Sequence, residues 1–219
     1  MAVYEKGNET KRRLILSTYE KLQEKDASQV TVREIAESNH CSPAALYRHF
    51  ESLEYLIILA SIRFFDDYMV EYGKVMDSDE NLLKMYLEGW KVFNHYAFER
   101  PDLYYRLLWG QYNASFSDAL DEYFELFPVA GSEKNPAYFY TLLFTSDIKD
   151  RDLLILKRAV NYNLLSYEDA VYFSRSNTLI VKGLLEEYMR KDPESRKKGE
   201  QECNQLLRQN LERVYILEE

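Results

Sequence analysis

Three side chains that can donate hydrogen bonds follow one another in this chain, as Tyr47, Arg48 and His49. Directly before them, Ala44 and Ala45 are small enough to let their backbone approach another molecule closely. A phenol, a guanidinium and an imidazole all donate to phosphate oxygens and to acceptor groups on base edges. The chemistry predicted for this stretch is therefore the binding of a nucleic acid.

Two short helices are predicted to position these side chains. Thr31 and Glu34 have the spacing of a capping box, in which each side chain accepts a hydrogen bond from the backbone amide of the other. Ser42 is a good N-cap, and Pro43 suits the first position of the helix that follows. Two helices joined by a tight turn are the layout of a helix-turn-helix, whose second helix enters the DNA major groove. The alternative is a buried helical hairpin, which would seldom combine these features.

Four stretches of the sequence carry a family pattern. They are residues 14–19, residues 31–36 (Thr-Val-Arg-Glu-Ile-Ala), residues 41–50 (Cys-Ser-Pro-Ala-Ala-Leu-Tyr-Arg-His-Phe) and residues 52–56. Together they resemble the N-terminal domain of TetR-type transcriptional regulators over about residues 10–65. The resemblance implies a homodimer that binds a palindromic operator and leaves it when a small molecule enters the C-terminal domain.

Three positions depart from the family pattern. His40 occupies a turn position that usually carries Gly, so a left-handed backbone is predicted there. Asn39 replaces a small apolar residue. Leu53 stands where the family commonly has a Lys that contacts phosphate, which predicts weaker non-specific DNA binding and a salt slope lower by about one unit.

The composition describes an ordinary globular protein, with 46% hydrophobic and 30% charged residues among 219. Seven Gly and five Pro favour helices over strands. Without a run of about 18 apolar residues or a basic-then-apolar leader, a cytoplasmic protein without membrane contact is expected. Cys41 and Cys203 match no metal spacing and are expected to be reduced packing residues.

The net charge of −9 is distributed unevenly, with −1 over residues 1–60 and −8 over the remainder. The acidic remainder discourages stray contacts with DNA. Lys11, Arg12 and Arg13, at the head of a first helix predicted over about residues 9–25, are candidate phosphate contacts. The alternative for these three is a merely solvated helix start.

The predicted fold is all-α with two domains. A helix-turn-helix DNA-binding domain is expected at residues 1–52 and a larger helical effector-binding and dimerisation domain at 53–219, connected by one helix of about residues 52–74. The last two helices, about 166–191 and 193–217, carry apolar stripes suited to dimerisation or to the core of one chain. The stripes comprise Val171, Leu179, Ile180, Gly183, Leu184 and Tyr188, then Leu206, Leu207, Leu211, Val214 and Tyr215.

Nineteen Tyr, eleven Phe and two Trp make up 15% of the chain, and most lie after residue 60. Such side chains can line a pocket for a small hydrophobic or aromatic effector, or can pack the core and a dimer interface. Glu88 and Asp118 in the same predicted helices allow a cationic ligand. The candidate ligand-binding residues are Trp90, Phe93, Tyr112, Phe116 and Phe144.

Each candidate DNA contact has a predicted role. Residues 42–45 are expected to approach the bases, Tyr47 and His49 to bind phosphates, and Arg48 to bind a guanine or the backbone. Two residues at the head of the preceding helix are expected to contact the flanking backbone. The candidate DNA-binding residues are Val32, Arg33, Ser42, Pro43, Ala44, Ala45, Tyr47, Arg48 and His49.

The predicted function is a sequence-specific DNA-binding transcriptional regulator, a ligand-responsive repressor that binds a palindromic operator as a homodimer. The alternative is a helical protein-interaction module with weakened DNA binding, suggested by Leu53, His40 and the acidic total. An enzyme is not expected, because the sequence shows no metal-ligand spacing, phosphate-binding glycine loop or nucleophile turn. His95 lies apart from the other two His, and no cofactor or metal is predicted.

Overall fold

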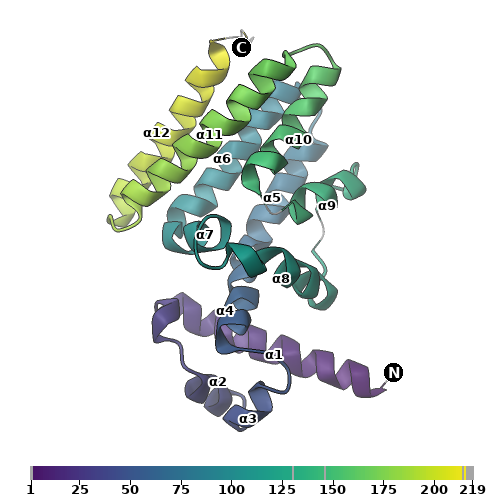
Figure 1. Cartoon of the computed structure of the whole chain (residues 1–219), viewed down its shortest axis with the longest axis vertical. Helices are drawn as coiled ribbons and strands as arrows, with labels where there is room; N and C mark the ends of the chain where they lie inside the picture. Colours follow the sequence, from purple (N-terminus) through teal and green to yellow (C-terminus); the bar gives the residue numbers. More distant parts are fainter. Residues whose placement is uncertain (1, 130, 146, 214, 216–219) are drawn as a thin grey trace. The chain divides into compact units, whose positions relative to one another are not determined.

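The computed structural model describes residues 2–129, 131–145, 147–213 and 215. Over these ranges the chain forms α-helices and two short 3-10 helices, without strands (Figure 1), which confirms the predicted all-α class. The chain divides into two compact units. The first comprises the residues up to Asp66 together with Ala114–Val129, and the second comprises Asp67–Asn113 and the residues after Val129. The functional division predicted after residue 52 stays a prediction.

Each unit has its own set of helices. The first contains α1 (Ala2–Glu24), α2 (Val32–Ser38), α3 (Pro43–Leu46), α4 (Leu53–Ile62) and α8 (Asn113–Leu126), with 3-10 turns at Ala27–Gln29 and Arg63–Phe65. The second contains α5 (Asp66–Asp77), α6 (Leu82–Glu99), α7 (Pro101–Leu108), α9 (Pro136–Phe144), α10 (Ile148–Asn161), α11 (Tyr167–Tyr188) and α12 (Pro193–Glu212).

The core of the first unit is built from the apolar faces of its short helices. Its buried side chains include Leu14, Ile15, Leu22, Ile35, Ala36, Leu46 and Phe50. Tyr19 is half-buried, and its ring lies 4.6 Å from the ring of Phe64. Full burial of one Leu or Ile side chain contributes about 1.5–3 kcal/mol, so this core is what holds α2 and α3 on α1 and α4.

The helix predicted over about residues 52–74 is interrupted. α4 ends at Ile62, a 3-10 turn covers Arg63–Phe65, and α5 begins at Asp66. The tighter turn places two consecutive aromatic rings on different partners: Phe64 lies against Tyr19, and the ring of Phe65 lies 6.0 Å from that of Phe116. The expected single helix is therefore two α-helices joined by a turn, because packing of these rings decides the local backbone.

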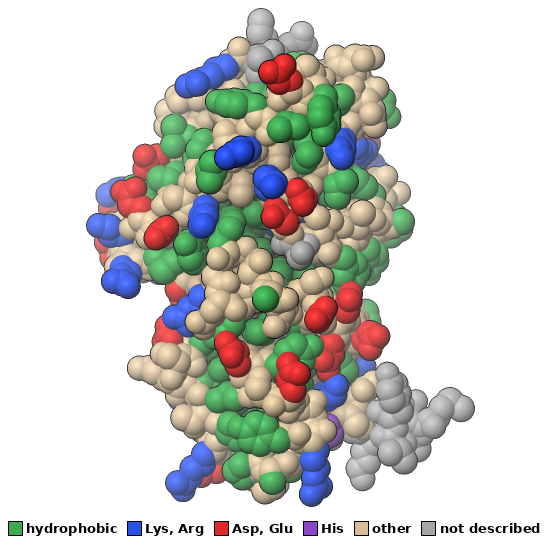
Figure 2. Space-filling model, viewed as in Figure 1, with side chains coloured by type: hydrophobic (Ala, Val, Ile, Leu, Met, Phe, Trp, Pro, Cys, Tyr) green, Lys and Arg blue, Asp and Glu red, His purple; other side chains and the backbone are tan. Residues whose placement is uncertain are grey.

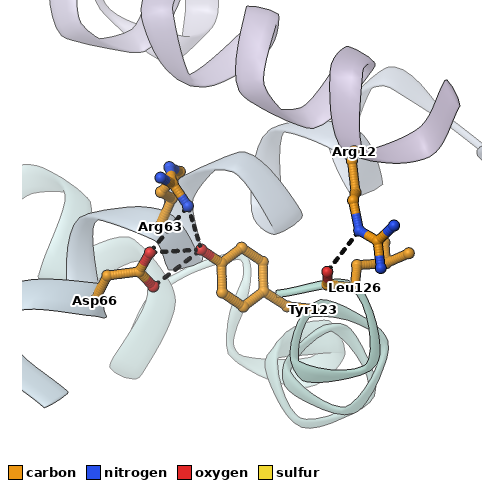
Figure 3. A network of polar contacts seen from close by, with 5 residues as sticks. All are labelled: Arg12, Arg63, Asp66, Tyr123 and Leu126. Atoms are coloured by element: carbon orange, nitrogen blue, oxygen red, sulfur yellow. Dashed lines mark hydrogen bonds and ion pairs between the residues drawn. The ribbon is translucent and has the colours of Figure 1, made fainter. Parts of the chain in front are cut away.

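Helix α8 belongs to the same compact unit as the helix-turn-helix, although about fifty residues of the second unit separate the two in sequence. Arg12 of α1 donates from Nε to the backbone carbonyl of Leu126 at 2.7 Å (Figure 3). The carboxylate of Glu122 binds Lys11 of α1 and accepts a hydrogen bond from the hydroxyl of Tyr55 at 2.9 Å. These contacts attach α8 to both α1 and α4.

Tyr123 forms the buried part of the same attachment. Its side chain is fully buried, and its hydroxyl lies 2.9 Å from both carboxylate oxygens of Asp66 (Figure 3). Arg63 pairs with Asp66 at 3.0 Å and reaches the Tyr123 hydroxyl at 3.4 Å. The network connects α8 to the turn that follows α4. Helix α8 and the helix-turn-helix therefore belong to one compact unit.

In the second unit, α6 packs against α10, α11 and α12. Its buried face carries Tyr86, Trp90, Phe93 and Ala97, which recur at the spacing of one helix face. Many of the aromatic side chains of the chain therefore serve the interior of this unit, which is one of the two alternatives that the sequence left open.

The predicted apolar stripes of the last two helices are divided between core and surface. Leu207 and Leu211 of α12 are buried within the chain, whereas Val171 and Leu179 of α11 are 41% and 59% exposed. Val214 lies outside the described residues. The α12 stripe thus contributes to the core, and the α11 stripe leaves apolar side chains on the surface.

Candidate nucleic-acid interface

Both predicted helix starts are present in the structure. Thr31 and Glu34 form the capping box, with the Thr31 amide donating to Glu34 Oε1 at 3.0 Å and the Glu34 amide donating to Thr31 Oγ1 at 3.4 Å. Ser42 accepts from the amide of Ala45 at 3.2 Å, and Pro43 begins α3. Local hydrogen bonds between residues three apart therefore set where both helices begin, as the sequence predicted.

The turn between α2 and α3 has the predicted left-handed residue. His40 has φ of 51°, its amide donates to the Glu37 carbonyl at 3.2 Å, and the next amide, of Cys41, donates to the Ala36 carbonyl at 3.0 Å. These two bonds are the pattern of a Schellman helix end. Asn39 is buried and its side chain donates to the Ile35 carbonyl at 2.8 Å, so a polar residue is satisfied beneath the turn.

His40→Gly is expected to stabilise the protein by about 0.5–1 kcal/mol, because glycine adopts the left-handed backbone without the steric cost that His pays. Urea unfolding of the full chain measures the change. His40→Ala is the matched control, since it removes the exposed imidazole and keeps the strained backbone. Equal stabilisation by both variants would show that the side chain, and not the backbone, is the cause.

Most of the predicted DNA-contacting side chains are exposed on one motif. Tyr47 is 52% exposed, Arg48 is exposed, and His49 is half-buried. These three follow α3, which ends at Leu46, and continue it as a helical turn in which the amide of His49 donates to the Leu46 carbonyl at 2.9 Å. Ser42, Pro43, Ala44 and Arg33 are also exposed, and Val32 and Ala45 are half-buried. Basic side chains project at the end of this unit where α2 and α3 lie, at the bottom of Figure 2.

Arg33 has an internal partner that competes with a phosphate. Its Nε lies 2.8 Å from Glu37 Oε1 one helical turn away, and both side chains are well exposed. Exposed ion pairs of this kind contribute little to stability, because water screens the attraction and both side chains lose conformational freedom. The guanidinium can therefore exchange Glu37 for a phosphate group.

His49 carries an imidazole whose pKa is lowered from its usual value. Burial is the main cause, and the nearby positive charges of Lys11 and Arg48 act in the same direction. The side chain is consequently neutral at physiological pH, where it offers a phosphate an uncharged N–H donor.

Two of the basic residues predicted as candidate phosphate contacts are used inside the protein. Lys11 binds Glu122 and lies 5.9 Å above the Phe50 ring, and Arg12 binds the Leu126 carbonyl. Arg13 is exposed. Lys11 and Arg12 thus have partners within the protein more than a hundred residues away in sequence, and their contact with phosphate stays a prediction.

The five predicted ligand-binding residues are spread over the structure. Trp90 and Phe93 line a cavity in the second unit, with their rings 5.5 Å apart. Tyr112 is buried, Phe116 lies in the first unit against Phe65, and Phe144 stacks on Tyr140; these three are not among the residues lining that cavity.

A buried carboxyl group in that cavity was not singled out from the sequence. Asp152 is 3% exposed and lines the cavity beside Trp90. It lies between Ile148 and Leu156, both buried, at intervals of four residues on α10. An acid within an apolar helical stripe is the sequence signal that would have identified it.

Metal and membrane features are absent from the described part of the chain. Over residues 2–129, 131–145, 147–213 and 215, no group of three or more His, Cys, Asp and Glu side chains could hold a metal ion. In the same ranges, no helix combines the length and the apolar character needed to cross a bilayer.

The two capped helices and the turn between them form a helix-turn-helix motif, with hydrogen-bond donors exposed on it. Residues 14–58 match the family model described as bacterial regulatory proteins, tetR family. Residues 14–58 are therefore similar to the N-terminal domain of this family, as the sequence resemblance predicted.

Comparison with solved structures gives likenesses to regulators of low sequence identity. One is a variant of TetR from Acinetobacter baumannii AYE in complex with minocycline, at 16% identity and TM-score 0.49, covering 90% of this chain and 92% of that chain. Another is the TetR family transcriptional regulator PfmR from Thermus thermophilus, at 16% identity and TM-score 0.47, covering 90% of this chain and 97% of that chain. No curated protein matches the sequence.

Proposed function

We propose that this protein is a ligand-responsive repressor that binds a palindromic operator as a homodimer. The observation that carries the proposal is the exposed surface of α2 and α3, on which small residues and hydrogen-bond donors stand together over a buried apolar support. One such motif makes few contacts, and two motifs related by two-fold symmetry read two half-sites about one helical turn apart or slightly more.

The residue roles follow from exposure and chemistry. Ser42, Pro43, Ala44 and Ala45, at the head of α3, approach the base edges because none of them has a bulky side chain. Tyr47 and His49 bind phosphates, and Arg48 reads a guanine or holds the backbone. Val32 and Arg33, at the head of α2, contact the flanking backbone.

Selection of bound duplexes from a random DNA pool by the purified full chain tests this function. We expect enrichment of a two-fold symmetric site and a steep decrease of affinity with salt. A folded protein that enriches no site and binds duplex DNA without salt dependence would instead support the alternative, a protein-interaction module. Leu53 in place of a Lys is the reason for considering that alternative. Repeating the selection after unfolding, washing and refolding excludes a retained ligand as the cause.

The surface of α11 supports the homodimer. Val171, Tyr172 and Leu179 are 41%, 51% and 59% exposed, although all three are large and apolar. On the same helix, a Cβ added to Gly183 would meet nothing within 4 Å, so another backbone can approach closely there. A second copy of this chain, related by a two-fold axis, buries this apolar surface against itself.

Leu179→Glu is expected to raise the dimer dissociation constant by more than about a hundredfold, because a carboxylate buried in an interface without a partner costs several kcal/mol. Sedimentation velocity over a concentration series measures the change. Val70→Glu on α5 is the control, since Val70 is 39% exposed and lies on another helix. Retention of the dimer by Leu179→Glu would place the interface elsewhere.

DNA affinity is expected to rise by up to roughly tenfold as the pH falls from about 7.5 to 5.5, through His49. A phosphate favours the imidazolium, so the pKa of His49 is higher in the complex than in the free protein. Affinity therefore increases as the pH falls through the pKa of the complex and levels off below the lowered pKa of the free protein. Fluorescence anisotropy with the selected duplex measures this. His49→Gln should show a flatter pH profile, and an equal gain in that variant would assign the effect to another group.

The cavity of the second unit is the proposed effector site. The cavity has a volume of about 30 Å³ beside aromatic rings. It combines apolar walls with few polar groups, as small-molecule sites do. Repression is released if the effector binds one of two dimer geometries more tightly than the other, since only differential affinity shifts a population.

A further inference from the structure

We propose that this cavity binds a small organic cation, with the carboxylate of Asp152 as the charged anchor and aromatic rings as its walls. The inference rests on the proposed effector site and specifies the chemical class of its ligand.

The carboxyl group of Asp152 is held in one orientation. Its Oδ2 accepts from the hydroxyl of Tyr86 at 3.0 Å, and its Oδ1 accepts from Nε1 of Trp90 at 2.9 Å. The hydroxyl of Tyr86 in turn accepts from the side-chain amide of Asn177, on α11, at 2.8 Å. A carboxylate has about four acceptor sites, so both oxygens can accept a further hydrogen bond from a ligand.

The charge of Asp152 is compensated only weakly within the described structure. No described basic side chain forms an ion pair with it, and Arg151, the adjacent residue, lines the same cavity. Burial removes the carboxylate from water at a large cost in free energy. A bound cation replaces the lost interaction with water by an ionic interaction. This charge balance favours a cationic ligand over a neutral or an anionic ligand.

The walls suit a cation that carries an apolar group. Tyr68 and Tyr72 of α5 and Trp90 and Phe93 of α6 line the cavity. The faces of such rings attract a positive charge, with Trp and Tyr the more effective, and they also bury apolar surface. A primary ammonium on an aromatic or short aliphatic body satisfies both the carboxylate and the rings.

Protonation of Asp152 is linked to occupancy of the cavity. Burial raises the pKa of Asp152 to about 7, while the hydrogen bonds from Tyr86 and Trp90 and the charge of Arg151 act in the opposite direction. Tyr68 and Tyr72 stay neutral because burial raises their pKa as well. A cation binds the ionised form, so its affinity should increase with pH from about 6 to 8 and then level off.

A series of probes that share one ring and differ in charge tests the proposal on the full-length protein without DNA. Benzylamine, benzyl alcohol and benzoate are titrated by calorimetry and followed by tryptophan fluorescence. We expect benzylamine to bind roughly ten- to a hundredfold more tightly than benzyl alcohol, as for a charge-assisted hydrogen bond, and benzoate not to bind. Equal binding of the first two probes, preference for benzoate, or no binding of benzylamine at millimolar concentration would overturn the proposal.

Two neighbouring variants separate a specific anchor from a general loss of structure. Asp152→Asn keeps the shape of the side chain and should reduce benzylamine affinity roughly tenfold or more and abolish its pH dependence. Arg151→Gln removes a competing positive charge and should raise the affinity. Unchanged affinity in Asp152→Asn, with benzylamine still preferred, would overturn the role of Asp152. If benzylamine binds as expected but leaves operator affinity unchanged, the cation site stands and the effector role fails.

Discussion

Arg48→Glu is expected to weaken operator binding by about a hundredfold, because the lost contact contributes roughly 1–3 kcal/mol and the new carboxylate repels phosphate. Arg48 is exposed and follows α3 directly, on the same motif as the exposed head of that helix. The logarithmic salt slope should decrease by about two units, since a positive charge is replaced by a negative one. Fluorescence anisotropy with the selected duplex at several salt concentrations measures both quantities.

Lys157→Glu is the matched control for Arg48→Glu. It changes the net charge by the same amount at an exposed position on α10, in the second compact unit. We expect little loss of affinity from this variant. Equal losses from the two variants would assign the effect to total charge, and no loss from Arg48→Glu would remove Arg48 from the interface.

Tyr123→Ala is expected to destabilise the first unit by about 3–5 kcal/mol, because a fully buried aromatic side chain is replaced by a cavity. Tyr123→Phe keeps the ring and removes the hydroxyl from Asp66 and Arg63, for an expected loss of about 1–3 kcal/mol. Burial and the charge of Asp66 raise the pKa of Tyr123, so the hydroxyl remains a donor at working pH. The native protein should therefore keep the hydrogen bonds of the Tyr123 hydroxyl over the whole physiological pH range.

Hydrogen exchange measured by mass spectrometry locates the effect of the Tyr123 variants. Residues up to Asp66 and residues 114–129 should lose protection together, while residues 67–113 keep theirs, because only the first two belong to one compact unit. Tyr162→Ala and Tyr162→Phe are the controls, since Tyr162 is 70% exposed. Loss of protection in α8 alone would show that the helix-turn-helix folds without it.

The helix-turn-helix surface proposed to bind DNA was predictable because its determinants are local. The capping box of Thr31 and Glu34 and the cap at Ser42 join residues three positions apart. The left-handed backbone of His40 follows from the turn that two adjacent helices require. Inward-facing Leu46 and Phe50 lie one helical turn apart. Each of these features depends on the identity of a few consecutive residues.

The proposed effector site was predictable only in part. An aromatic-rich sequence indicates that rings line a pocket or fill a core, and periodicity places Trp90 and Phe93 on one face of α6. No feature of the local sequence distinguishes Trp90 and Phe93 from Phe116, which packs in the other unit. Asp152 is hydrogen-bonded to Tyr86 and Trp90, which lie more than sixty residues away in sequence. This arrangement forms only when α10 packs against α6.

The sequence alone determined the helical class, the helix-turn-helix and the residues that it exposes, because those follow from short-range hydrogen bonds and from apolar periodicity. The tertiary structure decided which long-range partners each charged group has. Lys11 and Arg12 bind α8, and Asp152 is buried beside a tyrosine and a tryptophan. The physical reason is that an ion pair or a buried carboxyl depends on where distant helices meet, and the path of the chain between them is set by the packing of the whole core.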